Sequence, residues 1–437
     1  MVIFEHFQGK KGRRAESLCD KLVVHCREWE NIVMMVFDRK IPDFEKGLAR
    51  RTESFQESVI REMTRLGDVT GAVNLSQGLP DFSAPDVVLE AAVEAIRQGE
   101  NQYTFPFGDP EFRNAISDKY IRDNGVVFDP ALEITVTCGV SEAMLATILA
   151  LTDPGDEIII LEPWYENYLP DCALAGVTPR FVALQLPDYA LDQAELAKAF
   201  NDKTRLILIN TPHNPSGKIF SKEDLTFIAG LCKQHEVIAV TDEIYEYILY
   251  DGARHISIAS LEGMRERSVT ISGLGKTFSV TGWRIGWAAA CEPLSALIRK
   301  VHDYLTVCAP APFQKAGITA LNLGEGYFEQ VIRQYTQARE MFLPGLRNAG
   351  FKIYVPEGAY YIMADFSGID WPEEKYQNPA WTKDRVFAEF IAQEIGVAVV
   401  PGSSFFHCVE NGVHLVRFNF AKKESTLLEA VKRLERL

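Results

Sequence analysis

The sequence lacks the patterns of a metal site, a disulfide framework and a membrane span. Its eight cysteines are scattered through 437 residues, with no CxxC pair and no Cys/His spacing of the kind that binds zinc. No uninterrupted apolar run approaches the length that a bilayer requires, and internal repeats are absent. Reduced thiols are the simplest interpretation of these cysteines. We therefore expect a cytoplasmic protein that does not contact a membrane.

Basic residues are fewer than acidic residues. Lys and Arg together number 45 and Asp and Glu number 60, which gives a formal net charge of −15 and a pI near 5.1. This balance argues against nucleic acid as a partner, because a phosphate backbone is bound by a surplus of Lys and Arg. Anionic small molecules stay possible as ligands, since one arginine can dominate a site whatever the net charge.

The first fifty residues carry no pattern that indicates chemistry. They contain no signal-peptide core, and their acidic residues are untypical of a mitochondrial presequence. Met34 or Met35 could mark the natural start. We assign residues 1–50 to an N-terminal extension of unknown role.

Hydrophobic periodicity divides the rest of the chain into two parts. From about residue 84 to residue 273, helix-like segments alternate with short apolar runs, which is typical of a parallel sheet covered by helices on both faces. The expected strands span residues 133–138, 157–162, 178–184, 205–210, 237–243 and 268–273. Long helices and a smaller α+β pattern follow. We predict a large α/β domain over residues 78–309, a small domain over 310–437, and a segment 51–77 that packs with the small domain.

Polar motifs follow several of these strands, at the edge where parallel sheets collect ligands. CGVSEAM (138–144) opens a helix whose free N–H groups can bind an anion beside Ser141. NTPHNPSGK (210–218) presents the amide of Asn214. TDEIYEY (241–247) places Asp242 and Tyr245 together, and a carboxylate at the end of an apolar strand is costly unless it faces a cation. Each motif alone fits an ordinary turn, cap or solvated strand end as well.

The stretch SGLGKTFSVTGWRIGW (272–287) sets one lysine, Lys276, among small residues. A lone lysine is usually a solvated surface charge. Gly273, Gly275 and Gly282 change that expectation, because they let the backbone approach a flat ligand. A lysine held there can form an imine with an aldehyde if its amine is kept neutral.

Together these motifs resemble the class I and II aminotransferases, fold type I enzymes that use pyridoxal 5′-phosphate (PLP). GLGKTFSVTGWRIG (273–286) fits the family's lysine signature, and the resemblance extends from about Val73 to the C-terminus. Five suited residues occur in the family's order: Asn214, Asp242, Tyr245, Lys276 and Arg284. The resemblance implies a three-layer αβα large domain with a mostly parallel seven-stranded sheet, together with a smaller α+β domain.

The resemblance also implies a role for each residue. Lys276 would hold PLP as an imine and later carry a proton between the substrate α-carbon and the cofactor. Asp242 would bind the pyridine nitrogen, while Tyr245 and Asn214 would donate to the phenolic oxygen of the ring. Arg284 would bind the phosphate.

Further matches complete the implied site. Val140 and Ser141 would join the phosphate through their backbone amides, and Tyr165 would stack on the ring. Tyr103 matches a tyrosine that reaches the phosphate of the neighbouring subunit, which implies a homodimer with active sites at its interface. Arg417, with Asn214 and the backbone of Gly78, would bind the substrate α-carboxylate.

Two positions depart from the family pattern. Gly273 stands where many relatives carry a serine, so Ser272, one residue earlier, is the candidate for that serine's contact with the phosphate. Val140 replaces a glycine, at a position where the contact is made by backbone.

The stretch YDGARHISIASLEGM (250–264) resembles the kynurenine, glutamine and methionine aminotransferase branch. This implies an L-amino acid donor of that type and a 2-oxo acid acceptor in a ping-pong reaction. Aromatic residues in loops that usually border the pocket favour a large apolar side chain, although core packing explains them equally well: Phe105, Phe107, Tyr360, Tyr361, Phe405 and Phe406. An aspartate aminotransferase is the alternative. A PLP-dependent β-lyase and a non-enzymatic regulator are further alternatives, although residues 1–72 hold no convincing helix-turn-helix.

Overall fold

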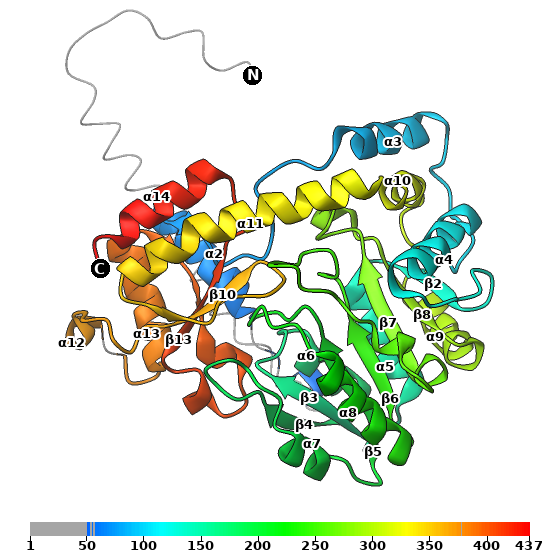
Figure 1. Cartoon of the computed structure of the whole chain (residues 1–437), viewed down its shortest axis with the longest axis horizontal. Helices are drawn as coiled ribbons and strands as arrows, with labels where there is room; N and C mark the ends of the chain where they lie inside the picture. Colours follow the sequence, from blue (N-terminus) through cyan, green and yellow to red (C-terminus); the bar gives the residue numbers. More distant parts are fainter. Residues whose placement is uncertain (1–49, 53–54, 56, 377) are drawn as a thin grey trace, which may run out of the picture. The chain divides into compact units, whose positions relative to one another are not determined.

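The computed structural model describes residues 50–52, 55, 57–376 and 378–437. The chain separates into residues 1–53 and residues 54–437, and only Arg50–Thr52, a 3-10 turn, is described in the first of these. The expected N-terminal extension therefore lies almost wholly outside the described residues. Residues 54–437 form the body that carries the site (Figure 1). No helix in the described ranges has the length and apolar character needed to cross a membrane.

A seven-stranded sheet forms the centre of this body. β8 is antiparallel to both of its neighbours, and all other adjacent strands are parallel. The predicted mostly parallel sheet is confirmed, with β8 as a strand that was absent from our expected list. The order across the sheet is β2 (Ile134–Thr137), β8 (Gly286–Ala290), β7 (Ser268–Gly273), β6 (Ile238–Asp242), β5 (Thr204–Asn210), β3 (Glu157–Glu162) and β4 (Thr178–Ala183).

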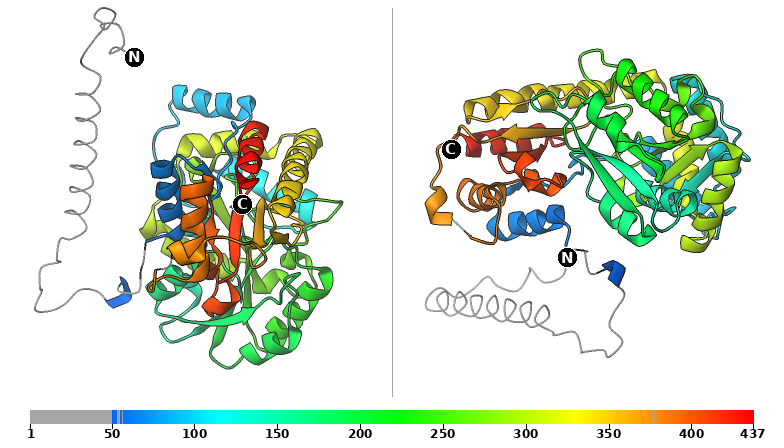
Figure 2. Two further views of the ribbon diagram at one scale, coloured as in Figure 1. Left: turned by 90° about the vertical axis from the view of Figure 1, so that its left-hand side faces the viewer. Right: turned by 90° about the horizontal axis from the view of Figure 1, so that it is seen from below.

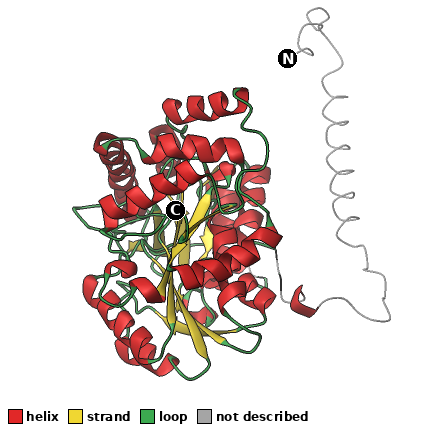
Figure 3. Cartoon of the chain, turned by 90° about the vertical axis from the view of Figure 1, so that its right-hand side faces the viewer, coloured by secondary structure: helices red, strands yellow, loops and turns green. Residues whose placement is uncertain are grey.

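Helices cover both faces of the sheet, as Figure 3 shows. Alternate residues of β3 enter different clusters: Ile158 and Ile160 pack with α5, α6 and α9, whereas Ile159 and Leu161 pack with α7 and α8. A strand buried on both sides must be apolar throughout, which explains the continuous runs in the sequence. The helices of this part are α3 (Asp86–Arg97), α4 (Pro110–Asn124), α5 (Val140–Leu151), α6 (Tyr168–Ala175), α7 (Gln193–Ala199), α8 (Lys222–Gln234) and α9 (Glu292–Leu305).

Local sequence signals set the helix ends. Asp109 caps α4 by accepting hydrogen bonds from the backbone N–H groups of Glu111 and Phe112, Pro110 occupies the first turn, and Gly125 ends the helix at φ 66°. This is the order of cap, proline and glycine that favours a helix of defined length.

A second, antiparallel sheet lies beyond the large one, in the order β12 (Val400–Pro401), β13 (Leu415–Asn419), β10 (Tyr361–Asp365) and β9 (Lys352–Ile353). The long helix α11 crosses the molecule above both sheets (Figure 1). The remaining helices are α10 (Ala311–Leu321), α11 (Glu325–Asn348), α12 (Glu373–Tyr376), α13 (Lys383–Phe390) and α14 (Glu424–Leu434).

The segment before the large sheet packs against these C-terminal elements. β1 (Val73–Asn74) pairs in parallel with β11 (Val397–Ala398), and Glu62 of α2 (Val59–Thr70) forms an ion pair with Arg385 of α13. Figure 2 shows α2 in blue beside the orange and red segments. The N-terminal end of α2 is thereby brought to the cavity described next.

Candidate active site

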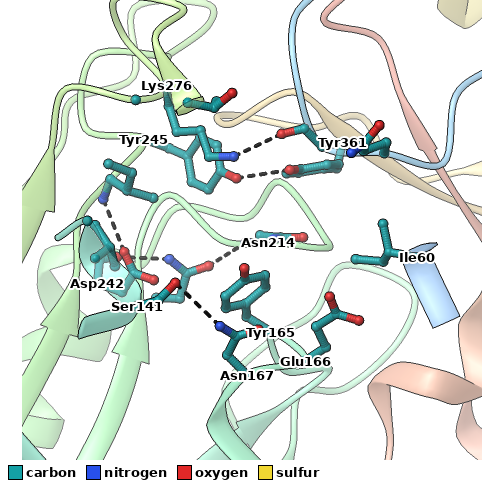
Figure 4. Close-up of a pocket in the computed structure, with 18 of the residues that line it drawn as sticks. Ile60, Ser141, Tyr165, Glu166, Asn167, Asn214, Asp242, Tyr245, Lys276 and Tyr361 are labelled. Atoms are coloured by element: carbon teal, nitrogen blue, oxygen red, sulfur yellow. Dashed lines mark hydrogen bonds between the residues drawn. The ribbon is translucent and has the colours of Figure 1, made fainter. Parts of the chain in front are cut away.

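A cavity of about 510 Å³ opens at the carboxyl edge of the large sheet and is closed by residues of the small sheet (Figure 4). Among its lining residues are ten of the twelve that the sequence pointed to: Gly78, Val140, Ser141, Tyr165, Asn214, Asp242, Tyr245, Lys276, Arg284 and Arg417. Among these ten, Gly78 and Arg417 are 339 positions apart in the chain, and folding brings both to one space.

The sheet register brings the polar strand ends together. Asn210, the last residue of β5, is paired with Asp242, the last residue of β6. The side-chain amide of Asn210 donates to the backbone carbonyl of Asp242 at 2.8 Å, and its oxygen accepts from the backbone N–H of Asn214 at 2.6 Å. Asn210 was not among our candidates, yet it fixes the loop that carries Asn214.

Asp242 is a buried carboxylate with few partners. It is 4% exposed, and it accepts hydrogen bonds from the hydroxyl of Tyr168 at 3.1 Å and from the backbone N–H of Ile244 at 3.3 Å. Burial raises the pKa of Asp242 from 3.8 to about 6. A cationic N–H placed at this carboxylate would reverse the shift, because an opposite charge stabilises the ionised form.

Lys276, Tyr245 and Tyr361 lie next to one another in the cavity (Figure 4). The Lys276 Nζ donates to the backbone carbonyl of Gly78 at 2.9 Å, and it lies 5.8 Å from the centre of the Tyr245 ring. The Tyr245 and Tyr361 hydroxyls are 3.0 Å apart. Burial raises the pKa of Tyr245, so its phenol stays protonated and is available as a donor. A Cβ at Gly78 would lie 2.2 Å from the Tyr361 hydroxyl, so glycine is needed there.

One end of the cavity is built to receive an anion. Gly139, at φ 82°, turns the chain into α5, whose first residues are Val140 and Ser141. Free N–H groups at a helix start carry a partial positive charge. Arg284 approaches so closely that a Cβ at Gly139 would lie 2.5 Å from its Nη2 atom. Helix end and guanidinium therefore form a cradle that a side chain at residue 139 would fill.

Arg417 provides the second anion site. It is 0% exposed, and it donates to the Asn214 side-chain oxygen at 3.0 Å and to the Ser76 carbonyl at 2.8 Å. Its Nε has no hydrogen-bond partner, and among the described residues no carboxylate forms an ion pair with it. The guanidinium lies 4.4 Å from the centre of the Tyr361 ring. A buried cation without a counter-charge indicates an anionic ligand.

Two of the predicted site residues do not line the cavity. The Ser272 hydroxyl donates to the Glu246 carboxylate at 2.8 Å, and that carboxylate also forms a buried ion pair with Lys119. Tyr103 lies on the surface and is 82% exposed. Among the lining residues of this cavity in residues 54–437, neither Ser272 nor Tyr103 is therefore found.

The cavity also has lining residues that sequence reasoning missed. They include Ser58, Ile60 and Arg61 near the start of α2, and Glu166 and Asn167 next to Tyr165. The Ser58 hydroxyl donates to the Glu166 carboxylate, with distances of 2.8 and 2.9 Å to its oxygens. Only tertiary folding brings together residues separated by 108 positions, although the N-cap serine of α2 is visible in the sequence. Of the six loop aromatics considered above, only Tyr361 lines the cavity.

Comparison with known proteins decides the family. The model of the family described as aminotransferase class I and II matches residues 70–434. The chain belongs to this family. A probable N-succinyldiaminopimelate aminotransferase of Mycobacterium tuberculosis is 36% identical over 395 residues, which cover 88% of this chain and 97% of the relative. The mouse kynurenine–oxoglutarate transaminase 1 is 35% identical over 416 residues, which cover 88% and 96%.

Solved structures agree with this assignment. An Escherichia coli protein reported to have a methionine aminotransferase function superposes with a TM-score of 0.84 at 35% identity, covering 90% of this chain and all of that one. The predicted aminotransferase, its fold type I architecture and its likeness to the methionine and kynurenine enzymes are confirmed. Members of this family depend on PLP.

Proposed function

We propose that this aminotransferase holds PLP on Lys276 and moves an amino group from an L-amino acid with an uncharged, large side chain to a 2-oxo acid, in two ping-pong half-reactions. The observation that carries the proposal is the single cavity in which a lysine amine, a buried carboxylate and an arginine without a counter-charge face one space. These groups suit an aldehyde, a ring nitrogen and a substrate carboxylate respectively.

The residues of the cavity fit this cofactor from end to end. When bound, PLP supplies an aldehyde that takes up the amino group and a ring that withdraws electrons from the substrate α-carbon. The cradle of Arg284 and the α5 start, with Ser141 and the Val140 amide, suits its phosphate. The partner-poor carboxylate of Asp242 suits a protonated ring nitrogen, and the ring of Tyr165 supplies an aromatic wall.

The remaining groups orient the substrate and move its proton. Arg417 and Asn214 would bind the α-carboxylate together, since their side chains are already hydrogen-bonded to each other. The Nζ of Lys276 would remove the proton from the α-carbon and return it, as a positioned general base and acid. Tyr245, kept protonated by burial, would donate a hydrogen bond to the phenolic oxygen of the ring.

The start of α2 and Glu166 also line the cavity, and they would border the substrate side chain. Figure 4 shows Glu166 beside Ile60 and Tyr165. The Glu166 carboxylate, held by Ser58, opposes a second carboxylate on the substrate, whereas Ile60 offers an apolar contact. This favours donors such as methionine or kynurenine over aspartate. Arg61 is the lining cation that an aspartate enzyme would have to use.

Half-reaction rates test the donor preference. Loss of the visible band of the bound cofactor would be followed with methionine, kynurenine, phenylalanine, glutamine and aspartate in turn. Methionine, kynurenine or phenylalanine should react fastest and aspartate slowest, and Glu166→Gln should raise the rate with aspartate relative to methionine. Faster aspartate than methionine in the unchanged enzyme would reverse the assignment in favour of an aspartate aminotransferase.

Removal of the proposed attachment point tests the chemistry itself. Lys276→Ala should bind no covalently attached PLP and should lose transamination, while Lys203→Ala, a change of an exposed lysine, should keep both. Borohydride reduction followed by peptide mass mapping reports the attachment directly. Modification of another lysine would contradict the proposal.

A further inference from the structure

A second cavity, of about 630 Å³, lies beside β9, β10 and β13 of the small sheet. It shares no lining residue with the candidate active site. Its walls come from the loop after β4, residues 186–189, from β9 with the loop that follows it, and from β10 and β13 of the small sheet. Met363 and Leu415 supply its apolar floor, and both are buried.

Two tyrosines form an aromatic corner in this cavity. The rings of Tyr189 and Tyr354 meet edge to face, with centroids 5.7 Å apart and an interplanar angle of 79°. Tyr189 is 1% exposed, its backbone has a φ of 56°, and its hydroxyl forms no hydrogen bond with any described residue. A left-handed tyrosine costs about 1 kcal/mol or more. The fold keeps this side chain at the cavity in spite of that cost.

The charge around the cavity is almost entirely negative. The only basic side chain among its lining residues is Lys352, which lies 3.4 Å from the Ser367 hydroxyl. Asp251 is neutralised by an ion pair with Arg339. In the part of the chain that the structure describes, Asp188 and Asp365 form no ion pair. The acidic lining residues are Asp188, Asp251, Glu357 and Asp365.

We propose that this second cavity binds an organic cation with an apolar or aromatic body, placing its ammonium group between the Tyr189 and Tyr354 rings and the carboxylates of Asp188 and Asp365. Aromatic faces attract such cations through the ring quadrupole, and desolvated sites gain the most. The apolar floor receives the body of the ligand. The free hydroxyl of Tyr189 accepts from a protonated amine.

The position of this site links it to the catalytic cavity. Met363 on β10 is paired with Arg417 on β13, and cross-strand partners project from the same face of a sheet. Glu357, on the opposite wall, accepts from the backbone N–H of Ile219 and donates through its own N–H to the carbonyl of Gly217, in the loop that follows Asn214. An occupant therefore contacts the elements that carry the proposed carboxylate-binding pair.

Titration calorimetry of the full-length, cofactor-loaded protein with benzyltrimethylammonium tests the proposal. This quaternary ion cannot form an imine, so it does not compete for the aldehyde chemistry of the first cavity. We expect saturable one-site binding that benzyl alcohol and phenylacetate do not reproduce. The double substitution Asp188→Asn/Asp365→Asn should weaken it about tenfold or more, and Asp68→Asn, at an exposed acidic residue of α2, should leave it unchanged.

Two further results bear on the same point. Tyr189→Phe keeps the aromatic face and should retain binding of the quaternary ion. N,N-dimethylphenethylamine, whose protonated tertiary amine can donate to the hydroxyl but cannot form an imine, should lose affinity in this variant. Equal binding of benzyl alcohol would show a merely apolar groove, and unchanged affinity in the double variant would place the cation elsewhere. Either outcome overturns the proposal. Thermal melts of each variant confirm that the fold is retained.

Discussion

At the scale of single residues, the Asp242 carboxyl opposes folding until a cation reaches it. Its pKa is raised from 3.8 to about 6 in the folded chain, so the folded state binds a proton more tightly than the unfolded state does. The stability contributed by this carboxyl in the cofactor-free protein should therefore fall as pH rises from about 4 to about 6. Asp242→Asn should reduce the fall and make the cofactor-free variant more stable at pH 8, by about 1–3 kcal/mol. Asp171, whose pKa is raised by burial to about 7, keeps its own part of the pH dependence.

Urea denaturation of the cofactor-free protein at pH 5 and pH 8 measures this effect. Asp68→Asn, at an exposed carboxyl, serves as the control and should keep the pH dependence of the unchanged chain. The same Asp242→Asn variant should bind PLP more weakly, because its amide does not stabilise a protonated ring nitrogen. If the free energy of unfolding depended on pH in the same way with and without Asp242, its carboxyl would not be a group with a raised pKa in the folded chain.

Arg417 gives a second prediction at this scale. Arg417→Lys keeps a positive charge but loses the planar pair of donors, so kcat/KM should fall about 100-fold. The visible spectrum of the bound cofactor should be unchanged, since Arg417 is proposed to touch the substrate alone. Arg180→Lys, at a surface ion pair with Glu157, is the matched control. A variant that lost the cofactor band would place Arg417 at the cofactor instead.

The sequence predicted which residues are available for the site better than it predicted their partners. A polar residue at the end of an apolar strand, such as Asp242, is visible because it breaks a local pattern. The direction of a hydroxyl is not visible, since it depends on neighbours from distant elements. Ser272 illustrates this: its hydroxyl bonds to Glu246, which in turn pairs with Lys119 of α4. No feature of the sequence near residue 272 predicts that Glu246 and Lys119 will be its neighbours.

At the scale of secondary-structure elements, the start of α5 depends on Gly139. Gly139→Ala would place a Cβ 2.5 Å from Nη2 of Arg284 in a backbone with φ 82°. Gly155→Ala is a matched control, because Gly155 has φ 98° and no heavy atom within 4 Å of the added Cβ. Both should cost about 1–2 kcal/mol of stability through the backbone alone. Only Gly139→Ala should also weaken PLP binding, by tenfold or more, measured by fluorescence titration.

The same scale shows where periodicity succeeds and where it fails. The strands predicted at 157–162 and 268–273 are found with those bounds, because β-branched residues and burial on both faces agree there. β8, GWAAA, escaped prediction, since glycine and alanine have low strand propensity. Its glycine and alanines suit an interior position between β2 and β7: a Cβ at Gly286 would lie 2.6 Å from the Val140 backbone nitrogen. Close packing against the start of α5, rather than strand propensity, explains why small residues form this strand.

At the scale of the whole molecule, the described chain exposes an apolar surface near Tyr103. Residues 103–105 and 304–307 present large side chains to solvent, and His302 joins the two segments through a hydrogen bond to the Pro106 carbonyl. Their exposed fractions are 82% for Tyr103, 55% for Phe105, 91% for Tyr304 and 45% for Val307. Such a patch is typical of a surface that another subunit covers. It supports the proposal of a homodimer, and Tyr304→Glu should shift the protein toward monomers in sedimentation velocity.

Mixing of two inactive variants tests whether Tyr103 serves the neighbouring subunit. Consider a hybrid dimer of one Lys276→Ala chain and one Tyr103→Ala chain, in which each active site takes its lysine from one chain and its tyrosine from the other. One of the two sites then lacks both residues, and the other site has an intact lysine and an intact tyrosine. Co-refolding the two chains should therefore restore up to about a quarter of the unmixed activity, since random pairing makes about half of the dimers hybrid. Each variant refolded alone is the control. If Tyr103 acts within its own chain, no hybrid cavity is intact, and the mixture should be no more active than its two components.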